Sequence, residues 1–173
     1  MIGLLFCPGA VILFYGDDMI LKLTVRPIRT AAIPFDETTH DFCPGCEKHA
    51  ACWSCPPAID AKAMIARLRA RRDGWLFALD SAFADPRDLP GIWDENREYL
   101  LRLREKRPGS LAVGCGGCTA CETCAYPSPC RAPEKLLFPM EAYCVDVTAL
   151  AARTGLTMDA GAGRIRFFAL LLR

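Results

Sequence analysis

Ten of the eleven cysteines in this 173-residue chain lie between Cys43 and Cys144. Eleven is an odd number, so intrachain disulfide bonds cannot pair all of them. This density of cysteine is typical of two kinds of protein, secreted disulfide-rich domains and intracellular proteins that bind metal through thiolates. The fold must therefore accommodate either many cross-links or a metal site.

The N-terminal segment bears on the choice between these two kinds of protein. Residues 1–15 are apolar, but no Lys or Arg precedes them, and Asp17 and Asp18 follow. This pattern is unlike a secretory signal, and the apolar run is too short to span a bilayer. We therefore expect a cytoplasmic protein with reduced thiols and no association with membranes.

The same segment has two interpretations of its own. On the first, residues 1–18 are an extension upstream of a functional start at Met19, and Cys7 then has no role. On the second, the apolar residues 4–14 pack into the core. On the first interpretation, a single cysteine-rich, metal-binding domain spans residues 19–173.

The second cysteine group has the spacing of metal ligands. Cys115, Cys118, Cys121 and Cys124 are separated by three successive two-residue gaps, and Cys130 follows. Such gaps let the backbone turn and direct each sulfur inward, as in bacterial ferredoxins. We choose Cys118, Cys121, Cys124 and Cys130 as the ligands of a 4Fe–4S cluster, with Cys115 as a substitute. Because these ligands are local, we expect this group to be the primary site.

Zinc is the alternative metal, although zinc sites are usually built from two separated pairs of ligands. The spacing also departs from the ferredoxin pattern, because five residues separate Cys124 from Cys130 and Arg131 follows instead of Pro. A cubane with four thiolates carries a charge of about −2. Arg131 and Lys135 can offset that charge, or both are solvated surface residues.

The first cysteine group contains two pairs with the same two-residue gap, and we predict all four of its thiols as metal ligands. These cysteines are Cys43, Cys46, Cys52 and Cys55. A thiol–disulfide enzyme is an alternative for the second pair, but such enzymes place the first cysteine at the start of a helix, and here Pro56 and Pro57 intervene. His49 lies in this group as a possible ligand or as an ordinary loop histidine, and His40 is the other histidine.

Hydrophobic patterns predict strands that alternate with helices. The strands are expected at 20–26, where Pro27 ends the run, and at 75–79, 110–113 and 164–172. The helices are expected from Asp60 to about Arg72, from Trp93 to Pro108-Gly109, and from Asp146 to just before Gly155. We therefore predict an α/β single domain with a small parallel or mixed sheet, flanking helices and two cysteine-rich metal-binding loops.

Both cysteine groups are expected to converge on one side of this sheet. If the strands at 20–26 and 110–113 are parallel, the loops that follow them leave from the same carboxyl edge. Two clusters could then exchange electrons, or one cluster could take thiolates from both loops.

Several short segments carry distinctive motifs. They are Cys43-Pro-Gly-Cys46, Trp53-Ser-Cys55-Pro-Pro57, Cys118-x-x-Cys121-x-x-Cys124, Pro129-Cys130-Arg131-x-Pro133-Glu134, and Pro139-Met140-Glu141-Ala142-Tyr143 followed by Val145-Asp146-Val147. In these segments the chain, from about Val25 to its end, resembles an uncharacterised prokaryotic family described as predicted metal-binding proteins.

This resemblance implies a cysteine-bound metal, commonly presumed to be iron–sulfur, and names no substrate. It places seven cysteines at ligand positions and makes Cys52, Cys115 and Cys144 additions to the family pattern. The seven are Cys43, Cys46, Cys55, Cys118, Cys121, Cys124 and Cys130. The chain departs from the family at His49-Ala50, where Tyr-Gly is common, and at Pro139, where Ser is common.

Together these patterns favour a small iron–sulfur protein, with one or two 4Fe–4S clusters, that transfers electrons to a redox partner protein or senses redox state. A zinc-stabilised interaction domain is the first alternative. An enzyme with a substrate-activating cluster is the second, but the sequence has no C-x3-C-x2-C motif, Walker loop or G-x-G-x-x-G after a strand. With a net charge of +1 and no basic run, we expect no nucleic-acid partner.

Overall fold

The central strands of the sheet are buried on both faces. In the computed structural model, which describes residues 11–13, 20–114 and 116–173, β3 (Asp73–Ala82) pairs antiparallel with β2 (Ile20–Arg29) and with β6 (Arg164–Leu172). Leu76 of β3 contributes to the core on one face and Phe77 to the core on the other. Strands covered on both faces have nearly continuous apolar sequences, which explains the apolar runs in β3 and β6.

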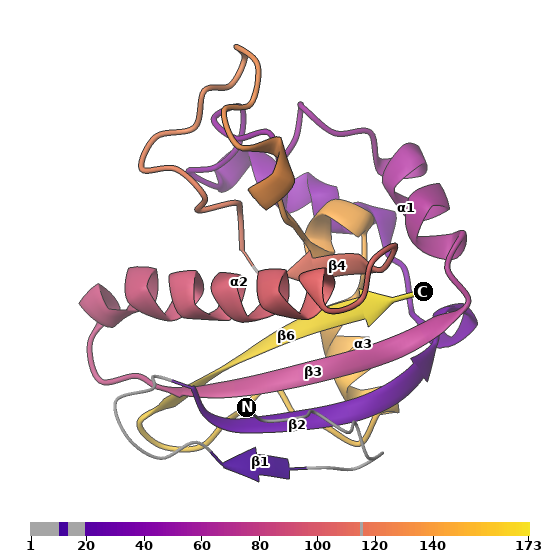
Figure 1. Cartoon of the computed structure of the whole chain (residues 1–173), viewed down its shortest axis with the longest axis vertical. Coiled ribbons are helices and arrows are strands. Elements are labelled where there is room, and N and C mark those ends of the chain that lie inside the picture. Colours follow the sequence, from indigo (N-terminus) through magenta and orange to yellow (C-terminus); the bar gives the residue numbers. More distant parts are fainter. Residues whose placement is uncertain (1–10, 14–19, 115) are drawn as a thin grey trace.

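The order of the sheet is β1-β2-β3-β6-β4-β5 (Figure 1). The remaining strands are β1 (Val11–Leu13), β4 (Leu111–Gly114) and β5 (Phe138–Pro139). Only the β4–β5 pair is parallel among the pairs in the described residues. The predicted α/β domain with a mixed sheet is therefore confirmed.

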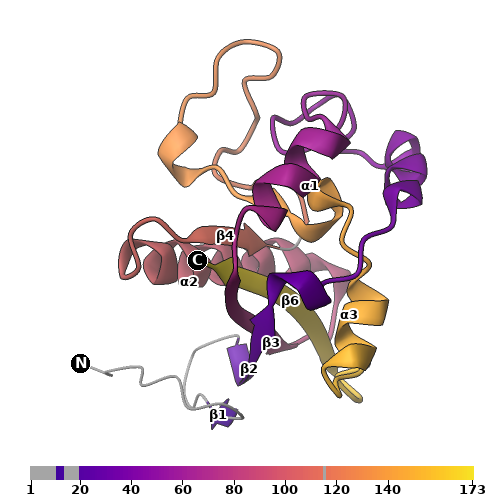
Figure 2. The ribbon, with the colours of Figure 1, turned by 90° about the vertical axis from the view of Figure 1, so that its right-hand side faces the viewer.

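Helices cover the two faces of the sheet (Figures 1 and 2). On one face, α2 (Leu89–Glu105) packs through Leu100 and Leu103 against Phe77 of β3. The other face is covered by α1 (Ala61–Arg69) and α3 (Val147–Arg153). Short 3-10 helices occur at η1 (Thr30–Ala32), η2 (Glu37–Gly45), η3 (Pro86–Asp88), η4 (Pro133–Lys135) and η5 (Met140–Tyr143). None of the helices in the described residues is long and apolar enough to cross a membrane.

Side-chain caps fix the starts of two predicted helices. The Asp60 carboxylate accepts a hydrogen bond from the Ala63 N–H at 2.7 Å, and Asp146 accepts one from the Ala149 N–H at 2.9 Å. These caps satisfy backbone donors of the first turn and confirm both predicted start points. The remaining predicted helix, α2, begins earlier than predicted. Pro90 lies in its first turn, where the backbone does not need an N–H donor.

The prediction that Pro27 ends the first strand is wrong, since β2 continues to Arg29. Within the described residues, β1 pairs only with Lys22–Thr24 of β2. Pro27 therefore lies where β2 has a partner on one side, and proline is tolerated on such an edge because no ladder donor is lost.

The expected parallel arrangement of β2 and β4 is also wrong. β2, β3, β6 and β4 are linked by three successive antiparallel pairings, so β2 and β4 run in opposite directions. The residues that follow β2 instead lie beside the segment that follows η5 and are hydrogen-bonded to it. The Asp36 N–H donates to the Cys144 carbonyl at 2.8 Å, and the Asp146 N–H donates to the Pro34 carbonyl at 3.1 Å.

A chain that starts at Met19 lacks β1, which lies at the edge of the sheet opposite β4 and β5. We expect this truncated protein to bind as much metal per chain as the full chain, because the cysteine loops lie at the other end of the molecule (Figure 1). The exposed edge of β2 should increase self-association. Metal analysis after desalting and light scattering measure the two effects. Loss of metal with an unchanged circular dichroism spectrum would show that residues 1–18 support the site.

Candidate metal centre

Each cysteine pair of the first loop forms a tight turn. The Cys46 N–H donates to the Cys43 carbonyl at 2.9 Å, and the Cys55 N–H donates to the Cys52 carbonyl at 3.2 Å. The Lys48 N–H lies 3.5 Å from Cys46 Sγ, which is an N–H···S hydrogen bond. Such turns bring the two sulfurs of a pair toward one side, and amide donors to sulfur tune a bound metal.

The two cysteine loops meet at the buried hydroxyl of Ser54. This hydroxyl accepts a hydrogen bond from the Cys118 N–H at 2.8 Å and lies 3.1 Å from Cys52 Sγ. Cys52 Sγ is also 3.9 Å from the Cys118 carbonyl. A single side chain of the first loop therefore fixes the first predicted ligand of the second.

A second contact joins the outer parts of the loops. The Trp53 indole N–H donates to the Ser128 carbonyl at 2.9 Å. The Trp53 and Tyr126 rings also pack edge to face, with centroids 5.1 Å apart. Figures 1 and 2 show the two loops side by side beyond the sheet. The predicted convergence of the loops is confirmed, although it arises from the returning chain after β2 and not from parallel strands.

Three thiols of the first loop line one cavity of about 220 Å³. They belong to Cys43, Cys46 and Cys55, and Gly117 of the second loop lies opposite. A Cβ on Gly117 would lie 3.4 Å from Cys55 Sγ and 3.0 Å from the Cγ atom of Lys48. Glycine at this position therefore lets the second loop approach the sulfur closely.

Protonation of the thiols follows from their contacts. The hydrogen bond with the Cys55 thiol lowers the pKa of Cys52 to about 5, and the same bond raises the pKa of Cys55 well above its ordinary value. Burial is the main cause that raises the pKa of Cys43, and the nearby Cys46 adds to it. Metal binding at these thiols must therefore release protons.

The other predicted ligands lie half-buried on the second loop, which projects from the end of the molecule (Figure 1). They are Cys121, Cys124 and Cys130. Arg131 donates to the Thr123 carbonyl and so ties this loop together, whereas Lys135 is exposed in η4. In the described part of the chain, no three His, Cys, Asp or Glu side chains are close enough together to hold a metal ion as they stand.

The remaining cysteines and histidines have no thiol of the two loops as a described hydrogen-bond partner, or lie outside the described residues. Cys7 and Cys115 lie outside the described residues. Cys144 is fully buried after η5, where its carbonyl accepts from Asp36. His40 Nε2 is 2.9 Å from the Glu141 carbonyl, and His49 is half-buried in the first loop.

The donor chemistry fits a cysteine-bound metal. Three soft thiols of the first loop line one cavity, and Gly117 of the second loop approaches the Cys55 sulfur without a side chain of its own. Residues 26–173 match the family described as predicted metal-binding protein (DUF2284). The chain belongs to this family. No curated protein and no solved structure matches it.

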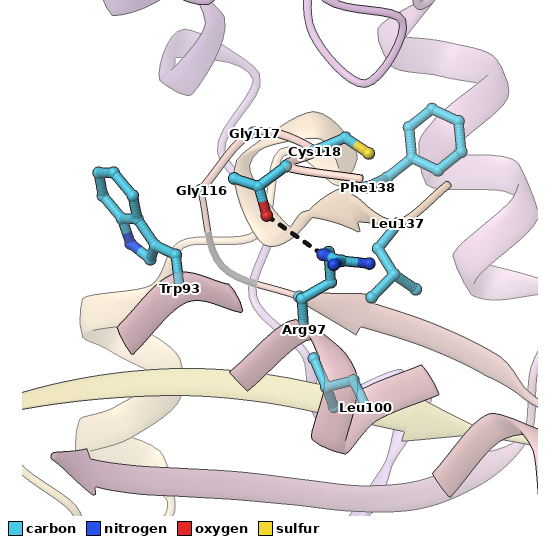
Figure 3. Close-up of a pocket in the computed structure, with 10 residues that line it drawn as sticks. Trp93, Arg97, Leu100, Gly116, Gly117, Cys118, Leu137 and Phe138 are labelled. Atoms are coloured by element: carbon cyan, nitrogen blue, oxygen red, sulfur yellow. Dashed lines mark hydrogen bonds between the residues drawn. The ribbon is translucent and has the colours of Figure 1, made fainter. Parts of the chain in front are cut away.

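Sequence reasoning missed one charged residue of this DUF2284 site. Arg97 of α2 lies beneath the turn that leads to Cys118, where its Nε donates to the Thr119 hydroxyl at 3.2 Å (Figure 3). Burial raises the pKa of the Cys118 thiol, and the charge of Arg97 opposes that rise. Trp93, Arg97 and Leu100 are spaced at i, i+4 and i+7. This spacing places Arg97 on the apolar face of α2, and it is the signal that could have identified it.

Replacing Gly117 tests whether the close approach of the loops matters. We expect Gly117→Val to weaken metal binding about tenfold or more, because overpacking costs about 1–3 kcal/mol and 1.4 kcal/mol is a factor of ten. Competition with a chelator measures the affinity. Gly45→Val is the matched control, since a Cβ on Gly45 meets nothing within 4 Å. Equal affinities in the two variants would show that the contact at Cys55 is irrelevant to the metal.

Proposed function

We propose that this DUF2284 protein binds one or two 4Fe–4S clusters and uses them to transfer electrons to a partner protein or to sense redox state in a reducing cytoplasm. The observation that carries the proposal is the contact of Ser54 with Cys118, which joins the two thiol groups at one end of the fold. A 4Fe–4S cluster supplies a redox couple whose potential depends on its charge, hydrogen bonds and exposure.

The residues of both loops have assigned roles in this proposal. The second loop holds metal through Cys118, Cys121, Cys124 and Cys130, and the first loop contributes thiols from the set Cys43, Cys46, Cys52 and Cys55. Arg97 lies beside Cys118 with a side chain that is 14% exposed, and although it also pairs with Asp94 and Glu98, its charge favours a thiolate at Cys118. The half-buried thiols of the projecting loop keep the cluster near the surface, where a partner protein can accept an electron.

Anaerobic purification tests the identity of the metal. We expect a brown protein that contains about four or about eight iron ions per chain with equal acid-labile sulfide, as one or two cubanes require. Reduction with dithionite should bleach the visible absorption and produce an electron paramagnetic resonance signal. A colourless protein that contains zinc would contradict the proposal and support the zinc-stabilised interaction domain.

Oxidation distinguishes electron transfer from redox sensing. An electron carrier should pass through repeated cycles of dithionite and ferricyanide with its iron content unchanged. A sensor should instead lose or convert its cluster on oxidation and change the order of the two loops. Protease cleavage between Cys121 and Cys130 reports that change, because the loop projects from the fold (Figure 1).

A further inference from the structure

A cavity of about 470 Å³ lies where β3 begins and is lined by residues of β2, of β3 and at the end of β6. Asp73 and Trp75 alternate with Phe77 along β3, so their side chains point to the face of the sheet that α2 covers. The helix ends at Glu105, and the start of β3 extends beyond this end (Figure 1). The cavity therefore occupies a part of that face that α2 leaves uncovered.

The charged residues of the cavity form one cluster around the Asp73 carboxylate. Arg173 Nε donates to this carboxylate at 2.5 Å, and Arg72 Nε donates to it at 3.3 Å. Arg29 is the register partner of Asp73 in β2, and no ion pair links it to another described residue. The Arg173 N–H donates to the Asp73 carbonyl at 2.8 Å, and its own carbonyl accepts from the Arg72 N–H at 2.7 Å. These contacts hold Arg72 and Arg173 in place before a ligand binds.

The two ion pairs leave most of the guanidinium donors available. Arg72 and Arg173 each use Nε, and their terminal NH2 groups form no hydrogen bond with another described residue. Their side chains are 88% and 62% exposed. Arg107 adds a further guanidinium, whose carbon lies 4.7 Å from the centroid of the Trp75 ring. Positive side chains therefore outnumber the carboxylate of Asp73 here, also when a main-chain carboxylate at Arg173 is counted.

We propose that this cavity binds a small molecule with two or more phosphate groups, which Arg29 and Arg173 contact directly. The planar guanidinium fork matches two oxygens of one phosphate in both charge and geometry. A singly charged ligand such as a carboxylate would leave most of the excess positive charge unbalanced. The cavity has a volume typical of small-molecule sites, and Pro27 and Trp75 add an apolar wall for the rest of the ligand. None of the described residues that line it belongs to a cysteine loop, so the site is independent of the metal centre.

Inorganic triphosphate is the probe, and isothermal titration calorimetry of the full chain at low ionic strength measures its affinity. We expect Arg29→Gln and Arg173→Gln each to weaken binding about tenfold, which corresponds to about 1.4 kcal/mol, because each removes a charge-assisted contact. Arg164→Gln is the matched control. Arg164 is also an exposed arginine of the sheet, but it lies opposite Ala82 at the other end of β3. Its replacement should leave the affinity unchanged.

Comparison with other anions identifies the source of the phosphate groups. ATP that binds as tightly as triphosphate would indicate a nucleotide, and weaker binding of ATP would indicate an inorganic polyphosphate; both results support the site. Tighter binding of a single-stranded oligonucleotide than of triphosphate would assign the arginines to nucleic acid and overturn the inference. Undetectable binding of triphosphate would also overturn it, as would equal loss of affinity in all three variants. The metal content of the variants should equal that of the wild type, so a failure of the proposed iron–sulfur function leaves these outcomes unchanged.

Discussion

Cys121→Ser and Cys124→Ser are each expected to remove most of the metal from the second loop and to lower the thermal stability of the protein. Serine oxygen is a poor ligand for a soft metal centre, and either change leaves the loop with three of its four predicted thiolates. The free energy of metal binding also stabilises the fold that the loop belongs to. Metal analysis and thermal unfolding under anaerobic conditions measure the two losses.

Cys144→Ala is the matched control for these two variants. Cys144 is fully buried among the residues after η5, and the structure assigns it no part in either loop. This variant should keep the full metal content and lose only the stability that packing of its sulfur provides. If both serine variants retained all of their iron, the second loop would not be the primary site.

Local signals in the sequence were sufficient for most of the helices and strands. Asp60 and Asp146 cap the helices that they were predicted to cap, and β6 spans the predicted residues. A cap depends on one side chain and a backbone donor three residues away, so nothing distant in the sequence alters it. The first turn of α2 was missed because Pro90 was interpreted as a break, although proline is acceptable there.

The direction of the strands could not be predicted from the same signals. A strand that is buried on both faces has an apolar sequence whether its neighbours run parallel or antiparallel to it. β4 pairs with β6, and Leu111 lies opposite Leu172 at the far end of the chain. Such a pairing depends on tertiary packing and not on any pattern within β4.

Some features of the candidate site were likewise predictable from local sequence, and others depend on tertiary contacts. The spacing of the cysteines identified the thiols, because a two-residue gap has a local geometric meaning. The contacts that bring the loops together were not predictable, because Ser54 and Cys118 are 64 positions apart in the sequence and Arg97 reaches the second loop from α2. The sequence also makes Cys52 appear equivalent to Cys55, whereas the structure places only Cys55 at the cavity.

Asp80→Ala is expected to cause the largest loss of stability away from the thiols. Asp80 of β3 lies opposite Arg166 of β6, and two hydrogen bonds of 2.5 and 2.7 Å join their side chains. The carboxylate is 2% exposed and the guanidinium 10%. Removal of one partner from a buried ion pair costs about 3–5 kcal/mol, because the other charge stays buried without its counter-charge. Among the described residues, Arg166 would keep only its hydrogen bonds to the Thr157 and Asp159 carbonyls and to the Thr157 hydroxyl, which carry no net charge.

Urea titration at constant metal content measures the free energy of unfolding. Arg87→Ala is the control, since Arg87 also forms a bidentate pair, with Asp85, but is 89% exposed and should contribute at most about 1 kcal/mol. The double variant Asp80→Leu with Arg166→Met should recover part of the loss, because an apolar pair leaves no buried charge. The thiols are untouched, so the metal content of all these variants should equal that of the wild type. A loss below about 1 kcal/mol in Asp80→Ala would mean that water reaches Arg166 and replaces its partner.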